Sequence, residues 1–249
     1  MGRTLSVCIS GLSERTTYHY RVKAENPVGT AYGNDVVFTT ADKAVDDIIF
    51  NPDLTYGSVS DNDGNTYKTI QIGTQTWMAE NLRTTKFNNG TAISGYSWYN
   101  NDSATYKSTY GALYNWYTIW FTIVGYNGNV CPLGWHIPSD DEWSTLTTYL
   151  GGEVVAGGKL KEIGTIHWIS PNTEATNLSG FSALPGGYGG NGIFRRMGVM
   201  GYWWSSSRVD GLSSSLYFAW YRVMYNNYRD VSRSEEYALS ELSIRCIKD

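Results

Sequence analysis

The run CPLGWHIPSDDEW at residues 131–143 constrains the fold most, because it passes from an apolar stretch directly into the first turn of a helix. Ser139 is placed to cap that helix with its hydroxyl, and Glu142, three residues later, to return a hydrogen bond to the cap. Acidic residues in the first turn also suit the positive end of the helix dipole. Apolar residues then follow at helical spacing, which predicts a helix over residues 139–150 that ends at the glycine pair 151–152.

Six further segments matter for the fold, three before that run and three after it. They are DGNTY at 63–67, QTWMAENL at 75–82, YGALYNWY at 110–117, SGFSALPGG at 179–187, GYWWSSS at 201–207 and SIRCIKD at 243–249. Together these segments resemble the major paralogous domain family first described from Fibrobacter succinogenes. The resemblance implies a C-type-lectin-like fold, shared with formylglycine-generating enzymes and with the variable proteins of diversity-generating retroelements. Since that fold hosts binding proteins and enzymes alike, it implies less about function.

We therefore expect an α+β domain over residues 58–249, with two short helices, a twisted antiparallel sheet and many long loops. Alternating apolar residues predict C-terminal strands at 202–206, 217–225 and 239–247. A strand passing into the first helix is expected over residues 114–121. The polar stretch 86–109, rich in Asn, Ser, Thr and Tyr, is predicted to be a long ordered loop.

Residues 1–40 form a separate unit that resembles the last third of a fibronectin type III domain, with a leucine (Leu12), a corner tyrosine (Tyr18) and a final β hairpin. The glycines at residues 29–33 predict the turn of that hairpin. A hairpin alone is marginally stable in water, so we expect the natural protein to extend further upstream, which would also account for the missing export signal. Residues 41–57 are predicted to be a linker.

Charge and hydropathy exclude two classes of partner. The formal net charge of −4 leaves no basic stripe, so we expect no nucleic acid as a partner. No apolar run reaches the roughly 18–20 residues that a helix needs to span a bilayer, so we expect no membrane span in this chain. At 249 residues, the chain is long enough to build a hydrophobic core without help from metals or disulfides.

The three cysteines, Cys8, Cys131 and Cys246, do not make a disulfide framework, because their number is odd. Cys131 and Cys246 both fall in segments that carry the family resemblance, and a bridge between them would suit an exported protein. Two buried free thiols are the alternative. Cys8 is expected to lie buried in a strand.

The sequence gives little support for a metal site or a catalytic site. The turn at 61–65 resembles the start of a calcium loop, but Ile72 stands where that loop needs a glutamate. The Glu-Pro-Asn, Gln-Pro-Asp and Trp-Asn-Asp motifs of calcium-dependent lectins are absent. A formylglycine-generating copper site needs two neighbouring C-terminal cysteines, and only Cys246 is present. His136 is interpreted as structural. We expect no metal, no cofactor and no catalytic residue.

The C-terminal region carries the candidate binding residues. Tyrosine, tryptophan and arginine are the residues that most often dominate binding interfaces. The candidates are Tyr202, Arg208, Tyr217, Trp220, Arg222, Tyr225, Asn227, Tyr228, Arg229, Arg233 and Tyr237. In the retroelement variable proteins the same segment holds diversified residues on an exposed sheet face, and here Arg195, Arg196 and the stretch 225–236 have a similarly mixed composition. A solvated sheet edge is the alternative.

These observations predict a non-enzymatic ligand-binding or adhesion module of a bacterial cell-surface protein, which is extracellular. Its expected partner is a protein or glycan on a cell or phage surface, bound through residues 202–237. Three alternatives stay open. One is a structural subunit or spacer of a surface fibre, in which the same face packs on neighbouring subunits. The others are a retroelement-diversified binding protein and an oxidase of the formylglycine-generating type, which the cysteine count disfavours.

Overall fold

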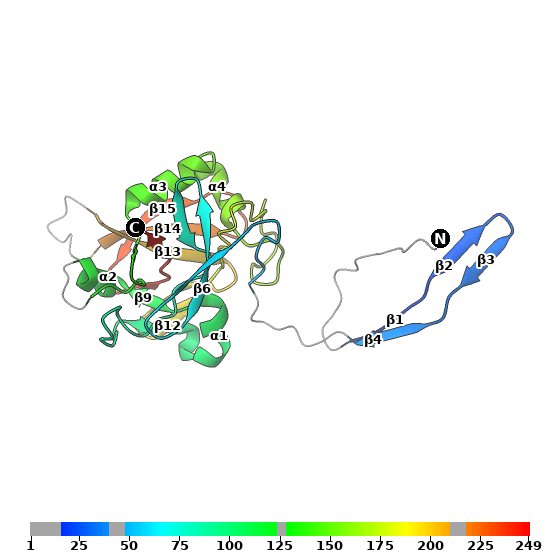
Figure 1. Cartoon of the computed structure of the whole chain (residues 1–249), viewed down its shortest axis with the longest axis horizontal. Coiled ribbons are helices and arrows are strands. Elements are labelled where there is room, and N and C mark those ends of the chain that lie inside the picture. The colour runs from blue at the N-terminus through cyan, green and yellow to red at the C-terminus, as the bar shows by residue number, and fades with distance from the viewer. Residues whose placement is uncertain (1–15, 40–47, 124–127, 210–217) are drawn as a thin grey trace. The chain divides into compact units, whose positions relative to one another are not determined.

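The chain divides into two compact units, residues 1–45 and residues 46–249, which we describe separately (Figure 1). The computed structural model describes residues 16–39, 48–123, 128–209 and 218–249. Residues 48–57, predicted as a linker, are part of the second unit, because Phe50, Leu54 and Tyr56 pack against its core.

The first unit is a long β hairpin. Its strands are β1 (Thr17–Tyr20), β2 (Lys23–Asn26), β3 (Gly29–Tyr32) and β4 (Val36–Thr39). β1 pairs with β4 and β2 with β3, both antiparallel. The predicted turn at residues 29–33 is wrong, because β3 occupies this stretch. The chain turns earlier, where the Asn26 side chain accepts hydrogen bonds from the backbone N–H groups of Val28 and Gly29.

The second unit is a mixed α+β structure with several antiparallel sheets. Its helices are η1 (Tyr99–Asn101, a 3₁₀ turn), α1 (Ser103–Tyr110), α2 (Trp116–Ile123), α3 (Asp140–Tyr149) and α4 (Glu153–Leu160). Its strands are β5 (Gly57–Ser60), β6 (Thr66–Ile72), β7 (Gln75–Met78), β8 (Tyr96–Ser97), β9 (Leu113–Asn115), β10 (Trp135–His136), β11 (Tyr188–Gly190), β12 (Ile193–Arg195), β13 (Met200–Arg208), β14 (Phe218–Tyr225), β15 (Ser232–Tyr237), β16 (Glu241–Leu242) and β17 (Ile247–Lys248). The sheets run β10-β17-β7-β6-β5, β12-β11-β16-β9-β8 and β13-β14-β15.

The helix predicted from the sequence capping pattern is present as α3. The N–H of Glu142 donates to the Ser139 hydroxyl, and the N–H of Ser139 donates to the Glu142 carboxylate at 2.7 Å, which is the predicted capping box. At the other end the N–H of Gly152 donates to the carbonyl of Thr147 at 2.8 Å. The glycine pair therefore ends α3 as expected.

The described residues contain four α-helices, where two were predicted. α1 lies inside the predicted loop 86–109, and begins where the Asp102 side chain accepts a hydrogen bond from the N–H of Thr105. α4 was missed because its Gly157 and Gly158 are poor helix formers. The predicted strand 239–247 is divided between β16 and β17.

The two glycines of α4 let this helix approach its neighbours closely. A Cβ on Gly157 would lie 2.2 Å from the carbonyl oxygen of Asp230, and one on Gly158 would lie 2.5 Å from that of Glu174. The N–H of Gly158 also donates to the carbonyl of Arg229 at 2.9 Å. Tertiary packing thus selects glycine here against helix propensity.

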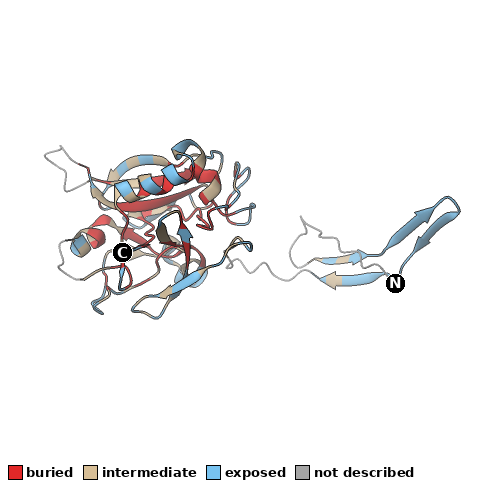
Figure 2. Cartoon of the chain, turned by 45° about the horizontal axis from the view of Figure 1, so that its top comes forward, coloured by how far each residue is buried: buried red, intermediate tan, exposed pale blue. Residues whose placement is uncertain are grey.

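Aromatic rings fill the centre of the second unit, where Figure 2 shows the buried residues gathered. Trp77 and Trp143 lie 4.8 Å apart between ring centroids, and Phe181 packs edge-on against both and against Trp203. All four rings are fully buried. The indole N–H of Trp203 donates to the Asn81 side chain at 2.9 Å.

A buried arginine joins this core to the C-terminal strand. Arg245 donates from Nε to the Asn81 side chain at 3.0 Å, and from its two other nitrogens to the carbonyls of Phe181 and Ser182. Its guanidinium also lies 4.1 Å from the centre of the Phe181 ring. Burial lowers the pKa of Arg245 to about 9. Because no carboxylate contacts it among the described residues, carbonyl and amide oxygens alone satisfy this charge.

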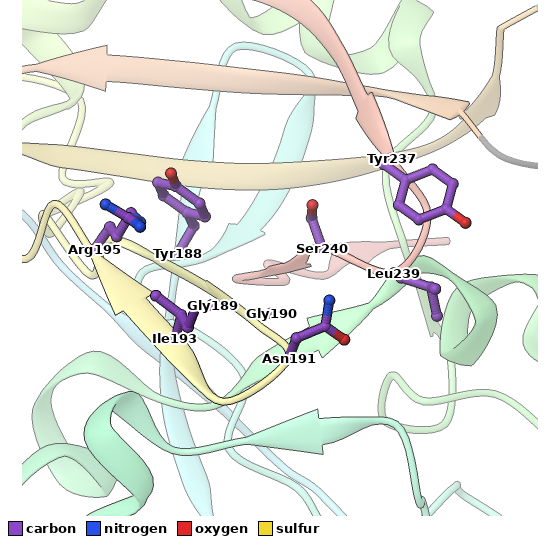
Figure 3. A pocket seen from close by; sticks show the side chains of 9 residues that line it. All are labelled: Tyr188, Gly189, Gly190, Asn191, Ile193, Arg195, Tyr237, Leu239 and Ser240. Carbon is purple, nitrogen blue, oxygen red and sulfur yellow. The ribbon is translucent and has the colours of Figure 1, made fainter.

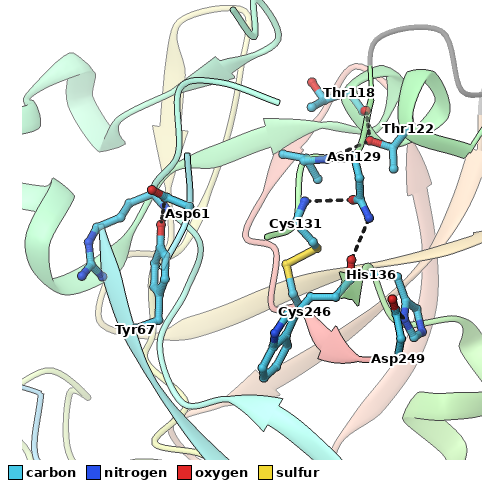
Figure 4. Close-up of a disulfide and its surroundings, with 12 residues drawn as sticks. Asp61, Tyr67, Thr118, Thr122, Asn129, Cys131, His136, Cys246 and Asp249 are labelled. Atoms are coloured by element: carbon cyan, nitrogen blue, oxygen red, sulfur yellow. Dashed lines mark hydrogen bonds and ion pairs between the residues drawn. A yellow bond between two sulfur atoms is a disulfide. The ribbon is translucent and has the colours of Figure 1, made fainter. Parts of the chain in front are cut away.

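Cys131 and Cys246 form a disulfide in this structure, with 5.9 Å between their Cα atoms (Figure 4). The bond joins the segment before α3 to the segment before β17. The Asn129 side chain supports it, accepting from the N–H of Cys131 and donating to the carbonyl of Trp135. Cys8 lies outside the described residues.

We expect Gly157→Ala to destabilise the second unit by about 1–3 kcal/mol, because the added methyl group meets the Asp230 carbonyl. Helix propensity alone predicts the opposite sign. Urea denaturation measures the change, with Val154→Ala on the exposed side of the same helix as control, expected to stay within about 0.5 kcal/mol. A Gly157→Ala protein as stable as the parent would contradict the close approach.

Trp203→Ala is expected to lower the free energy of unfolding by about 3–5 kcal/mol, because it empties the ring cluster and removes a hydrogen bond to Asn81. Thermal unfolding followed by near-ultraviolet circular dichroism measures this loss. A change below about 1 kcal/mol would mean that the ring is not part of the core.

Candidate ligand-binding face

The β13-β14-β15 sheet has two different faces. α3 and α4 lie along one face, which appears below these helices in Figure 1. Side chains alternate along a strand, so Arg222 and Met224 of β14 point toward α3, whereas Tyr221 and Tyr225 point to the opposite face.

A cavity of about 540 Å³ lies on that opposite face, a size that suits a small ligand or one group of a larger one. We call it the tyrosine pocket. It is lined by Tyr188, Arg196, Val199, Met200, Tyr202, Tyr221, Tyr225, Asn226, Asn227, Tyr228 and Glu236.

The tyrosine rings form a wall made of two contacting groups. Tyr202 lies 5.3 Å from Tyr188 and 5.8 Å from Tyr221 between centroids, and Tyr225 packs edge-on against Tyr228 at 5.7 Å. Strand register explains the arrangement, because Tyr202 opposes Val223, the residue between Tyr221 and Tyr225 on the same face. Such a wall offers flat apolar surface together with hydroxyl groups.

Burial raises the pKa of Tyr202, Tyr221 and Tyr225, the effect being partly offset at Tyr221 by a hydrogen bond with Ser234. These phenols therefore keep their protons throughout the neutral and mildly alkaline range. Each can donate one hydrogen bond and accept others.

A second pocket of about 200 Å³ adjoins the first and shares Tyr188 with it (Figure 3). Gly189 and Gly190 of β11 contribute backbone to its lining. It is lined by Tyr188, Gly189, Gly190, Asn191, Ile193, Arg195, Tyr237, Leu239 and Ser240.

The structure brings together only part of the predicted binding set. Tyr202, Tyr225, Asn227 and Tyr228 line the tyrosine pocket, and Tyr237 lines the second pocket. Sequence reasoning missed Tyr188, Tyr221 and Glu236 as lining residues. The alternation of side chains along β14 was the available signal for Tyr221, since it shares a face with Tyr225.

Three predicted residues, Trp220, Arg222 and Arg233, lie on the α3 face instead. Arg222 is fully buried and donates to the Asp140 carboxylate at 2.6 Å and to the Ser144 hydroxyl at 3.2 Å. Arg233 donates to the same carboxylate and lies 3.3 Å from the centre of the Trp220 ring. Arg222 and Arg233 thus hold the first turn of α3 against the sheet through Asp140, and none of the three residues lines the tyrosine pocket.

Two other predicted binding residues are exposed, but their side chains contact residues outside both pockets. Arg208 lies 4.6 Å from the centre of the Trp120 ring, and Arg229 forms an ion pair of 3.1 Å with Glu174. Neither lines the tyrosine pocket or the second pocket. Tyr217 lies outside the described residues.

A family comparison covers this whole region. The model of the Fibrobacter succinogenes major domain matches residues 70–248, which include both pockets, the disulfide, α3 and α4. The chain belongs to this family. No curated protein and no solved structure matches the chain.

The described residues contain neither a metal-binding cluster nor a membrane-spanning helix. In the described ranges, no three His, Cys, Asp or Glu side chains are grouped so as to hold a metal ion. None of the helices described is long and apolar enough to cross a membrane. At the turn that resembles a calcium loop, Asp61 accepts hydrogen bonds from Asn65 and Tyr67, which accounts for this carboxylate within the turn itself.

A buried lysine of this major domain supports the tyrosine pocket from within. Lys161 is fully buried, and its ammonium group donates to the carbonyls of Thr173, Tyr225 and Tyr228 at 2.7 to 3.1 Å. The contacts fix the turn after β14 that presents Tyr228. Burial lowers the pKa of Lys161 to about 8.

We expect Lys161→Met to destabilise the protein at pH 7 by about 1–3 kcal/mol, because three buried carbonyls lose their donor. From about pH 8 to 10.5, the unfolded parent keeps a proton that the folded parent has released. The stability of the parent relative to the variant should therefore rise with pH in this window. Urea titrations of both proteins at pH 7, 8, 9 and 10 measure the difference, and a flat or falling difference would contradict the lowered pKa.

Proposed function

We propose that residues 46–249 are a C-type-lectin-like, non-enzymatic binding module of a bacterial cell-surface protein, and that the tyrosine pocket receives its ligand. The ligand is a protein or glycan on a cell or phage surface. The observation that carries this proposal is the wall of tyrosines on the sheet face opposite α3 and α4.

The proposed fold is supported by how the C-terminus of the domain is held. β17 pairs with β7, so that the last strand closes a sheet begun by the first strands of the unit. The disulfide fixes the same C-terminal segment to the chain before α3. Both features fit the fold that the family resemblance implies.

The composition of the pocket suits recognition. Tyrosine provides a large contact area at a low cost in side-chain entropy, and asparagine adds adaptable hydrogen bonds. Tyr228 is 55% exposed and Asn227 is exposed, whereas Tyr202 is nearly buried and forms the base of the wall. Tyrosine is among the residues in which binding hot spots are enriched.

The proton affinities in the pocket favour binding over acid–base catalysis. A general acid or base works best with a pKa near the working pH. Burial raises the pKa of Tyr202, Tyr221 and Tyr225 away from neutrality, so these groups serve as fixed hydrogen-bond partners. Export is supported by the Cys131–Cys246 bond, since disulfides persist mainly in oxidising compartments.

The test is binding of the purified chain to a glycan array and to a panel of cell- and phage-surface proteins. We expect Tyr228→Ala to weaken binding at least about tenfold, with little change in melting temperature, because the ring is exposed at the rim. Tyr149→Ala, which removes an exposed tyrosine of α3 outside both pockets, is the matched control and should bind normally.

Retained binding in Tyr228→Ala, or loss of binding in Tyr149→Ala alone, would place the interface elsewhere. If the chain binds neither the glycans nor the surface proteins but associates with itself, the result would instead favour the alternative that it is a subunit of a surface fibre.

A further inference from the structure

Two neighbouring arginines stand out because they have no partner within the part of the chain that the structure describes. Arg195 ends β12 and Arg196 follows it, both with exposed side chains. Every other described arginine contacts a carboxylate, a carbonyl or an aromatic ring. Those arginines are Arg21, Arg83, Arg208, Arg222, Arg229, Arg233 and Arg245.

The two arginines border the two pockets where these adjoin. Arg195 lines the second pocket beside its cross-strand partner Tyr188, as Figure 3 shows, and Arg196 lines the tyrosine pocket. The charge of Arg196 also acts on the hydroxyls of Tyr202 and Tyr225, where it partly offsets the effect of burial on their pKa. The two cations therefore border two adjoining pockets that share Tyr188.

The backbone that presents these arginines is held in place. A Cβ on Gly187 would lie 2.3 Å from the carbonyl oxygen of Arg195, so only glycine permits this approach. The carbonyl of Arg196 accepts hydrogen bonds from the N–H groups of Val199 and Met200, both at 3.0 Å. The two guanidinium groups thus extend from a fixed turn.

The acidic residue of the tyrosine pocket is bonded within the chain. Glu236 accepts hydrogen bonds from the N–H of Tyr237 at 2.9 Å and from the Ser240 hydroxyl at 3.1 Å. It forms no ion pair with Arg195 or Arg196. The positive charge of the pair is therefore available to a bound anion, and guanidinium groups bind carboxylates with paired hydrogen bonds.

Building on the proposed function, we propose that the tyrosine pocket binds an acidic glycan, with sugar carboxylates held by Arg196 in that pocket and by Arg195 in the adjoining second pocket. Val199 and Met200 are the only aliphatic side chains of the lining, which otherwise presents rings, hydroxyls, amides and charges. A sugar ring matches such a lining, because its C–H face packs on tyrosine and its hydroxyls bond to groups such as Asn227 and Glu236. A peptide side chain would find little aliphatic surface here.

The experiment compares oligogalacturonate with the same oligosaccharide after reduction of its carboxyl groups, using the full chain and isothermal titration calorimetry. We expect the acidic form to bind about 10- to 100-fold more tightly, as for a charge-assisted hydrogen-bonded pair. The Arg195→Gln, Arg196→Gln double variant should lose that preference while its melting temperature stays unchanged. Arg208→Gln, Arg229→Gln is the control, since it removes two exposed arginines outside both pockets.

The possible results distinguish the acidic-glycan inference from the proposed binding function. Equal binding of the acidic and reduced forms, or a preference that survives the double variant, overturns the acidic-glycan inference and leaves the binding module in place. Binding of an acidic peptide instead of either sugar also overturns it. If the chain binds other ligands on the array but not oligogalacturonate, the acidic-glycan inference is also overturned. If it binds no ligand at all, the proposed binding function is overturned as well.

Discussion

A guanidinium with no carboxylate partner in the described structure organises the centre of the second unit. Arg245 is fully buried, and its charge is acceptable there only because Asn81 and the carbonyls of Phe181 and Ser182 converge on it. Asn81 also accepts from the Trp203 indole, so one amide serves the C-terminal segment and β13 together. Removing either polar partner would leave a buried charge or dipole unsatisfied, which costs more than the bond itself contributes.

Further buried cations hold the face of the β13-β14-β15 sheet that lies against α3 and α4, opposite the tyrosine pocket. Arg222 fastens α3 to one side of the sheet through Asp140. Lys161 holds the turn that carries Tyr228, using backbone carbonyls only. The tyrosines of the opposite face line a pocket that Arg196 borders, and Arg195 lines the pocket beside it.

Local signals in the sequence predicted the elements whose causes are local. α3 follows from the capping box of Ser139 and Glu142, which lie three residues apart. α4 could not be predicted in this way, because Gly157 is selected by the carbonyl of Asp230, more than seventy residues further along the chain. The candidate site shows the same division: Tyr225 and Tyr228 were found by residue type, but residue type also selected Arg222, which is buried under α3.

The sequence by itself determined the family, the mixed α+β character, the helix α3 and a C-terminal region rich in tyrosine, tryptophan and arginine. Only the tertiary structure decided which of those residues share a face. A strand exposes alternate side chains to opposite sides, and the position of α3 selects the side that is buried. Tyr188 and Arg196 reach the pocket from segments outside the predicted region, because chain connections bring β11 and the turn after β12 beside β13 and β14. Such proximity between distant segments is a property of the packed fold, not of any local pattern.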